Sequence, residues 1–226
     1  MSEMGKTEMS KQQLRIDLVS DVSCPWCIVG YKRLELAMAQ VADIIDVDVH
    51  WHPFELNLDL HQGGVNLRDY LMKRYGTTAE QSVQVRDNLT KLGKEVGFDF
   101  QFSDDMNVYN TRDAHKLVAW AAESGKQTEM KLALFQAYFS ENKAIEDHDV
   151  LAEAAKNAGL DAVEAKQVAA SEHWNKVVED DEVHWLSLGV HAVPALVVNQ
   201  QHLISGAQPV DILVEAMKDI ASEVQV

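Results

Sequence analysis

The sequence predicts an α/β protein whose sheet is built from the two ends of the chain and is interrupted by an inserted all-helical domain. Two observations predict this arrangement. Strand-like alternation of apolar and polar residues occurs near the beginning and the end of the chain, whereas the region between them repeats apolar residues at intervals of three and four. With 226 residues, 46% of them hydrophobic, the chain can form one domain that carries an insertion and a core that needs no disulfides.

The chain opens with a β-α-β pattern. Residues 14–18 alternate between apolar and polar and predict a strand. Apolar residues at helical spacing follow from 28 to 41, and Pro25 suits the first position of this helix because a backbone N–H would have no partner there. Residues 47–51 alternate again and predict a second strand.

The chain closes with a β-β-α pattern. Residues 195–199 form a short apolar run, Gln200–Gln201 predict a turn, and residues 202–205 predict another strand. Gly206 ends this strand, and apolar residues along one face predict a final helix over 209–222.

The middle of the chain, residues 58–188, is predicted to be helical. The predicted helices are 67–75, 80–96, 111–123, 129–142, 149–157, 162–170 and 173–188. Glycines lie at several of the boundaries, as helix C-termini prefer. These glycines are Gly76, Gly97, Gly125 and Gly159. Phenylalanines alternate with polar residues over 98–102 and predict a short extended piece.

A β-α-β opening and a β-β-α ending, separated by a helical insertion, is the layout of a thioredoxin fold. We expect a disordered N-terminus over residues 1–12, a thioredoxin-like domain over 13–57 and 189–226, and a helical insertion domain over 58–188.

Charge and hydropathy exclude several classes of partner. The formal net charge of -16 argues against a nucleic-acid partner, because phosphate binding requires an excess of Lys and Arg. No apolar stretch reaches about 18 residues, so we expect no membrane partner. Residues 1–12 lack the apolar core of a secretory signal, and we therefore expect a cytoplasmic protein.

The two cysteines of the chain, Cys24 and Cys27, are the candidate catalytic residues. They lie three apart, so a disulfide between them would close a very small loop and add little stability. Cys24 would sit at the N-terminus of the helix that begins at Pro25, where the free N–H groups and the helix dipole favour a thiolate. We expect Cys24, at an exposed lip, to be the nucleophile and Cys27 to resolve the mixed disulfide, while Pro25 and Trp26 modulate the pair.

A C-x-x-C pair also occurs as half of many zinc sites. Such a site needs two further ligands at compact spacing, and the nine histidines are scattered along the chain. A C-x-x-C that follows a strand and opens a helix favours redox chemistry, so we expect no metal.

Val193–Pro194 precedes the first strand of the closing segment. If this bond were cis, the Val193 backbone would be exposed beside the thiol and could pair with an extended substrate segment. An ordinary trans proline at the start of an edge strand is the alternative, and residue physics alone favours it.

Several motifs together carry a family resemblance. They are Asp21-x-x-Cys24-Pro25-Trp26-Cys27-x-x-Gly30 with Pro53–Phe54–Glu55–Leu56–Asn57, Asn110–Thr111–Arg112 with Ala114–His115, Phe135-x-Ala137–Tyr138–Phe139, and Val193–Pro194 with Ser205–Gly206–Ala207–Gln208. With matches spread from residue 14 to residue 217, the chain resembles the DsbA family of thiol–disulfide oxidoreductases, in particular its FrnE-like cytoplasmic branch. Ala192 and Leu196 depart from the Gly and Phe common beside the proline, which puts substrate preference in doubt.

The resemblance implies a thioredoxin fold with a helical insertion, a redox dithiol and a cis-proline at Pro194 that faces it. The substrates it implies are proteins or small thiols that carry a disulfide or a thiol. The cysteine pair needs no further cofactor, although glutathione stays open as a reductant or co-substrate. Asn110, Arg112 and His115 are candidates to line a cleft over Cys24, with a slightly favoured alternative in which they cap a helix or pack.

Two other functions stay open at this point. Related folds include the glutathione-dependent 2-hydroxychromene-2-carboxylate isomerases and kappa-class glutathione transferases, which generally carry Ser where Cys24 stands. The second alternative is a polypeptide-binding protein that works without disulfide exchange.

Overall fold

The computed structural model describes residues 11–223. The predicted disordered N-terminus lies outside these residues except for Lys11 and Gln12, and Gln12 already begins the first strand. Among the described residues, no helix combines the length and the apolar character that a membrane crossing requires.

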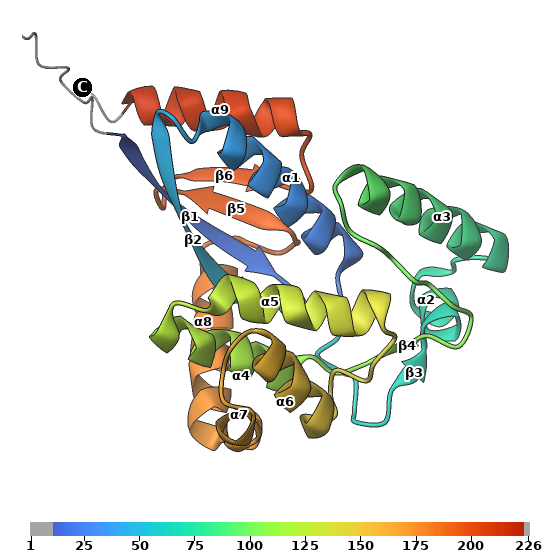
Figure 1. Ribbon diagram of the computed structural model, residues 1–226. Coiled ribbons are helices and arrows are strands. Elements are labelled where there is room, and N and C mark those ends of the chain that lie inside the picture. Colours follow the sequence, from blue (N-terminus) through green and yellow to red (C-terminus); the bar gives the residue numbers. More distant parts are fainter. Residues whose placement is uncertain (1–10, 224–226) are drawn as a thin grey trace, which may run out of the picture.

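The sheet has four strands in the order β2-β1-β5-β6. β1 (Gln12–Ser20) pairs in parallel with β2 (Ile45–Pro53) and antiparallel with β5 (Ala195–Val198), which pairs antiparallel with β6 (His202–Ser205). The central strand therefore comes from the beginning of the chain and its neighbour β5 from the end. This arrangement confirms the predicted thioredoxin fold with its inserted middle (Figure 1).

Helices cover both faces of the sheet. α1 (Pro25–Val41) and α9 (Val210–Glu223) contact each other and lie over one face, as Figure 1 shows. α8 (Glu172–Ser187) covers the other face, where Trp185 packs against Val19 and Ala195. The sheet is thus covered on two sides, which explains why β1 is buried along most of its length.

The insertion is mostly helical. Its helices are α2 (Leu67–Tyr75), α3 (Ala79–Glu95), α4 (Arg112–Ala121), α5 (Gln127–Phe135), α6 (His148–Asn157), α7 (Ala162–Ala169) and α8, with a 3₁₀ turn over Ala122–Ser124 and a π-helical turn over Gln136–Ser140. The prediction of an all-helical insertion was wrong in one place. β3 (Val65–Asn66) and β4 (Asn107–Val108) form a small antiparallel ladder, and two residues are too few to produce a strand pattern in the sequence.

The phenylalanines at 98–102 were predicted to lie in a short extended piece, and no strand pairing is found there. Residues 98–102 have no regular secondary structure, and their rings form a cluster with Phe139. Phe98 and Phe100 are buried because the chain there crosses α3 at Gly93, where an added Cβ would lie 2.5 Å from the Phe98 carbonyl oxygen. The alternation reflects packing against a helix rather than pairing in a sheet.

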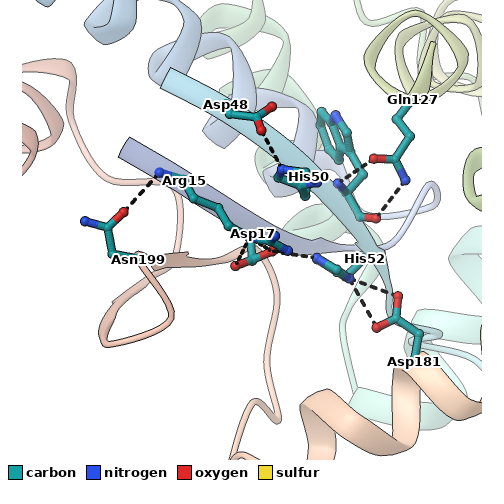
Figure 2. Close-up of polar contacts among 9 residues, drawn as sticks. Arg15, Asp17, Asp48, His50, His52, Gln127, Asp181 and Asn199 are labelled. Atoms are coloured by element: carbon teal, nitrogen blue, oxygen red, sulfur yellow. Dashed lines mark hydrogen bonds and ion pairs between the residues drawn. The ribbon is translucent and has the colours of Figure 1, made fainter. Parts of the chain in front are cut away.

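A charged chain of contacts joins the sheet to α8 (Figure 2). His52 of β2 lies between two carboxylates, with Nε2 2.9 Å from Asp17 and Nδ1 2.9 Å from Asp181 of α8. Arg15 donates to the buried Asp17 from the other side. These four residues tie two neighbouring strands of the thioredoxin domain to the last helix of the insertion.

The start of α5 extends the outer edge of β2. The Gln127 amide accepts a hydrogen bond from the Trp51 N–H and donates one to the Trp51 carbonyl, both at 3.2 Å (Figure 2). An amide side chain thereby satisfies backbone groups that an edge strand would leave unpaired. The same contact brings α5 beside the end of β2, the parallel neighbour of the strand β1 that leads to the cysteine motif.

Candidate active site

Cys24 lies at the end of the segment that leads from β1 into α1. It is the N-cap residue, with an extended backbone, and Pro25 occupies the first helical position as predicted. The Cys27 N–H donates to the Cys24 carbonyl at 3.1 Å, and Cys24 makes no side-chain capping hydrogen bond. The Cys24 sulfur is therefore at the positive end of the helix dipole, where an anion is stabilised.

Both thiols are free, and the Cys24 thiol is less accessible to solvent than predicted. Cys24 is only 4% exposed and Cys27 is fully buried, whereas Trp26 between them is 39% exposed. The prediction that Cys24 sits at an exposed lip was wrong, because the insertion comes over the N-terminus of α1. Cys24 is still the more accessible of the two, in agreement with its assignment as the attacking sulfur.

Burial raises the pKa of the Cys27 thiol well above its ordinary value, and the neighbouring Cys24 acts in the same direction. The Lys131 ammonium acts in the opposite direction. Lys131 belongs to α5 and is itself fully buried, and burial lowers its pKa to about 8. The inner cysteine therefore faces one buried cation that comes from the insertion.

Asp21 is a buried carboxylate three residues before Cys24. It accepts hydrogen bonds from the Leu56 N–H at 2.8 Å and the Ser23 N–H at 3.1 Å, and it faces Nε2 of His115 at 3.5 Å, longer than an ordinary hydrogen bond. Burial by itself would raise the pKa of Asp21, but these contacts outweigh it and hold the pKa below its usual value. Burial also lowers the pKa of His115, so a neutral imidazole lies beside this carboxylate.

A second buried cluster of charged side chains lies near Asp21. It contains Glu55 of the segment Pro53–Asn57, whose Leu56 N–H donates to Asp21. The Arg112 guanidinium contacts Glu55 at 2.5 Å and Glu182 of α8 at 3.2 Å, and Glu182 also accepts the Glu55 N–H at 2.8 Å. Burial, and then the nearby Glu182 carboxylate, raise the pKa of Glu55 to about 8 in spite of Arg112. One guanidinium therefore lies between two carboxyl groups in a largely buried site.

A cavity of about 280 Å³ opens beside the cysteine motif, between the start of α1 and helices α2 and α3. Pro25 and Trp26 form one side, and Leu71 and Val85 form part of the opposite, mostly apolar side. The Ser23 hydroxyl oxygen is buried at this cavity and has no hydrogen-bond partner among the described residues. The cavity offers an apolar group a place next to Pro25 and Trp26 of the cysteine motif.

Asn110, Arg112 and His115 do not line this cavity. Asn110 accepts the Arg112 N–H at 2.9 Å and donates to the Leu60 carbonyl, which is a capping role at the start of α4. Arg112 and His115 instead contact the carboxylates described above. Their place is beneath the motif, between the thioredoxin domain and the insertion.

The Val193–Pro194 peptide bond is cis. Pro194 packs against α1 at Gly30, where an added Cβ would lie 3.1 Å from the proline ring. The Pro194 carbonyl accepts the Gly206 N–H at 2.8 Å, which joins this loop to the end of β6. The cis bond is the one that the family resemblance implied, and the proline lies against the helix that carries both cysteines.

No group of three or more His, Cys, Asp or Glu side chains within residues 11–223 is arranged to hold a metal ion.

Sequence reasoning did not single out Lys131 or Glu182. Lys131 lies one helical turn before Phe135 and next to Met130, both of which are buried, so it interrupts an apolar face. That interruption was the available signal, because a lysine on a buried helix face needs a partner.

Comparisons with known proteins agree with this architecture. The family model "DSBA-like thioredoxin domain" matches residues 15–218. The uncharacterised protein YwbO of Bacillus subtilis (strain 168) is 27% identical over 208 residues, which cover 91% of this chain and 96% of YwbO.

Several solved structures share the fold, among them the following two. A probable DsbA oxidoreductase from Streptomyces coelicolor is 30% identical and has a TM-score of 0.85. The match covers 91% of this chain and 89% of that one. A 2-hydroxychromene-2-carboxylate isomerase has a TM-score of 0.71 at 14% identity, with 93% of this chain and 98% of its own covered, and this likeness concerns the fold alone. From its sheet, its cysteine motif and the family model that spans nearly all of it, this chain belongs to the family of proteins with a DSBA-like thioredoxin domain.

Proposed function

We propose that this protein is a thiol–disulfide oxidoreductase that uses Cys24 and Cys27 as a redox dithiol. The observation that carries the proposal is a pair of free thiols at the N-terminus of α1 in a DsbA-like thioredoxin domain, with the outer sulfur at the N-cap. This position favours the thiolate, which is the attacking species in disulfide exchange.

The exchange proceeds in two steps. The Cys24 thiolate attacks one sulfur of a substrate disulfide, so that a mixed disulfide forms and the other substrate sulfur leaves as a thiolate. Cys27 loses its proton and attacks the Cys24 sulfur, which forms the Cys24–Cys27 bond and releases the second substrate sulfur. The substrate gains two electrons and the dithiol is oxidised, and the reverse sequence oxidises a substrate dithiol.

The proposed substrates are proteins or small thiols that carry a disulfide or a thiol. The apolar cavity beside Trp26 supports a polypeptide substrate with an apolar side chain near its cysteine. Val193 and the cis Pro194 are proposed to hold the substrate backbone, which is supported by the packing of Pro194 on α1. The dithiol carries the electrons, and glutathione is a proposed small-thiol reductant.

We place this activity in the cytoplasm and the protein in the FrnE-like branch. The support is that the chain has two cysteines in all, both in the redox motif, so that none is left for the structural disulfides typical of oxidising compartments.

The decisive experiment is the reduction of insulin disulfides by wild-type protein and by Cys24→Ser, followed as turbidity of the released B chain. We expect Cys24→Ser to reduce insulin at the rate of the uncatalysed control, since the hydroxyl cannot form the mixed disulfide. Circular dichroism of the variant verifies its fold. Turnover equal to wild type in Cys24→Ser would reject the nucleophile assignment.

The same variant separates this function from the alternatives. Glutathione-dependent isomerase or transferase activity that survives in Cys24→Ser would favour the fold relatives that carry Ser at this position. Suppression of the aggregation of an unfolded client by a variant that lacks both cysteines would favour polypeptide binding, a function that the apolar cavity also supports.

A further inference from the structure

A buried lysine without a carboxylate partner lies beneath the cysteine motif. Lys131 is 0% exposed, and its ammonium donates one hydrogen bond, to the Ser20 carbonyl at 3.1 Å. Within residues 11–223 no carboxylate oxygen lies within 4 Å of its Nζ. A fully buried ammonium is otherwise found paired, because removing it from water costs several kcal/mol.

Within residues 11–223 no other group forms a direct ion pair with the ammonium. Its Nζ lies 5.5 Å from the ring centroids of both Trp51 and Phe135, which attract a cation but carry no negative charge. Asp21 is a buried carboxylate that acts on the ammonium through space, but its oxygens face the N–H groups of Ser23 and Leu56 and His115 rather than Lys131.

The anion that fits this site is a cysteine thiolate. Ser20, the hydrogen-bond partner of Lys131, is the last residue of β1 and precedes the loop to Cys24. The ring centroids of Trp51 and Tyr31 are 4.8 Å apart, and Tyr31 lies one helical turn after Cys27. Burial lowers the Lys131 pKa, whereas the charges of Cys27, Asp21 and Cys24 raise it. Lys131 in turn lowers the pKa of His115 of α4.

We propose that Lys131, contributed by the insertion, is the charge partner of the active-site thiolate and sets the redox properties of the dithiol. This inference rests on the proposed function. When the Cys24–Cys27 disulfide gains two electrons from a reducing thiol pair, the S–S bond breaks, one sulfur takes a proton and the other keeps a negative charge. Lys131 stabilises that charge through space, so it is a positioning residue rather than a group that attacks or leaves.

The test replaces Lys131 by methionine, which keeps the length of the side chain and removes its charge. Reduced Lys131→Met should react with iodoacetamide about tenfold more slowly at pH 7, with its alkylation–pH profile moved to higher pH, because a nearby opposite charge favours ionisation by at least this factor. Its equilibrium with glutathione should shift about tenfold toward the disulfide, which corresponds to a reduction potential about 30 mV more negative.

The matched control is Lys116→Met. Lys116 is also buried and donates to a backbone carbonyl, that of Ala169, but its ammonium is paired with Asp113 at 2.8 Å. We expect this variant to keep the alkylation profile and the redox equilibrium of the wild type. Lys131→Met should keep or gain stability, since an apolar side chain of similar size avoids the burial of a charge. A purely structural lysine predicts the opposite, a loss of stability with unchanged thiol reactivity.

A measurement on the wild type covers the case in which Lys131→Met fails to fold. With ¹⁵N-labelled lysine, NMR follows the ionisation of the Lys131 ammonium in the oxidised and the reduced protein. Because the coupling is reciprocal, the ammonium should keep its proton to higher pH in the reduced state. Equal ionisation in both states, or an unchanged alkylation profile in folded Lys131→Met, overturns the proposal. None of these measurements uses a protein substrate, so their outcome is separate from that of the insulin test.

Discussion

At the scale of single residues, the notable feature is the number of ionisable side chains buried around the dithiol. Glu55 and Glu182 share the guanidinium of Arg112 at the joint between the thioredoxin domain and the insertion. The raised pKa of Glu55 means that folding favours its protonated form. Between the ordinary pKa of a glutamate and about pH 8, Glu55 is therefore protonated in the folded state and ionised in the unfolded state.

This difference predicts a pH dependence of stability. The contribution of Glu55 is fully present below its ordinary pKa and is lost as the pH rises toward 8, because the folded state binds more protons in that window. Glu55→Gln, which imitates the protonated acid, should therefore exceed the wild type in free energy of unfolding at pH 9 by about 1–3 kcal/mol and approach it at pH 5. Urea titrations at the two pH values measure this. Glu123→Gln on the surface is the control, and an equal difference at both pH values would refute the protonated state of Glu55.

The burial order of the two cysteines predicts which variant traps substrate. Cys27→Ala keeps the attacking sulfur and removes the one that resolves the mixed disulfide, so it should accumulate a covalent adduct with a reporter peptide disulfide. Cys24→Ala should accumulate at least about tenfold less, because the remaining thiol is fully buried and burial raises its pKa. Mass spectrometry of the intact protein gives both yields. Equal adduct in the two variants would contradict the assigned order.

The sequence pointed to the cysteine motif but did not single out Lys131 and Glu182 beside it, for a physical reason. Cys24, Cys27 and Pro25 are neighbours in the chain, so the local strand-to-helix pattern is enough to place them. Lys131 and Glu182 reach the site only through tertiary packing, and helical periodicity tells which face a residue occupies but not what lies opposite. The cis bond at Pro194 was likewise expected from the family resemblance, since residue physics alone favoured trans.

At the scale of elements, α3 shows how one helix is fixed to its neighbour by the absence of a side chain. Ser82, Leu89 and Gly93 form its buried positions. A Cβ at Gly93 would lie 2.5 Å from both the Phe98 carbonyl oxygen and the Phe100 ring. Backbone and a packed aromatic ring cannot move aside easily, so this close approach requires glycine.

Gly93→Ala should therefore destabilise the protein by about 1–3 kcal/mol, although alanine is the better helix former by about 1 kcal/mol. The clash should exceed the gain in helix propensity. Urea denaturation measures the difference, and Lys94→Ala, at an exposed position of the same helix, should stay within about 0.5 kcal/mol of the wild type. A more stable Gly93→Ala would show that residues 98–100 do not pack on α3.

Most helices of the insertion begin and end within a few residues of the predicted bounds, because capping residues and glycines determine these ends locally. Gly76 and Gly125 adopt left-handed conformations after the helical segments they follow. The sequence pattern was misleading where the backbone changes helix type without a break in periodicity. Residues 111–123 and 129–142 were each expected to be one helix, but α4 continues into a 3₁₀ turn and α5 into a π-helical turn.

At the scale of the whole molecule, the thioredoxin domain and the insertion share one core. Leu14 and Ile16 of the central strand and Leu117, Leu134 and Phe139 of the insertion belong to the same cluster of buried residues. Together with the buried charges between the two parts, this continuity leaves no solvated boundary at which one part could unfold alone.

We therefore expect a single cooperative unfolding transition. Tryptophan fluorescence reports on both parts, since Trp51 lies in the sheet and Trp120 in α4, while far-UV circular dichroism reports mainly on the helices. The two urea curves should have the same midpoint and the same slope. Two separated transitions would mean that the insertion folds as an independent unit.

The contact between Lys131 and Ser20 joins residues 111 positions apart in the chain. A substitution in a distant helix can therefore change the reduction potential of such a dithiol while the four residues C-P-W-C stay the same. Grafting this tetrapeptide onto another scaffold would transfer the sulfur atoms but not the electrical environment in which they react.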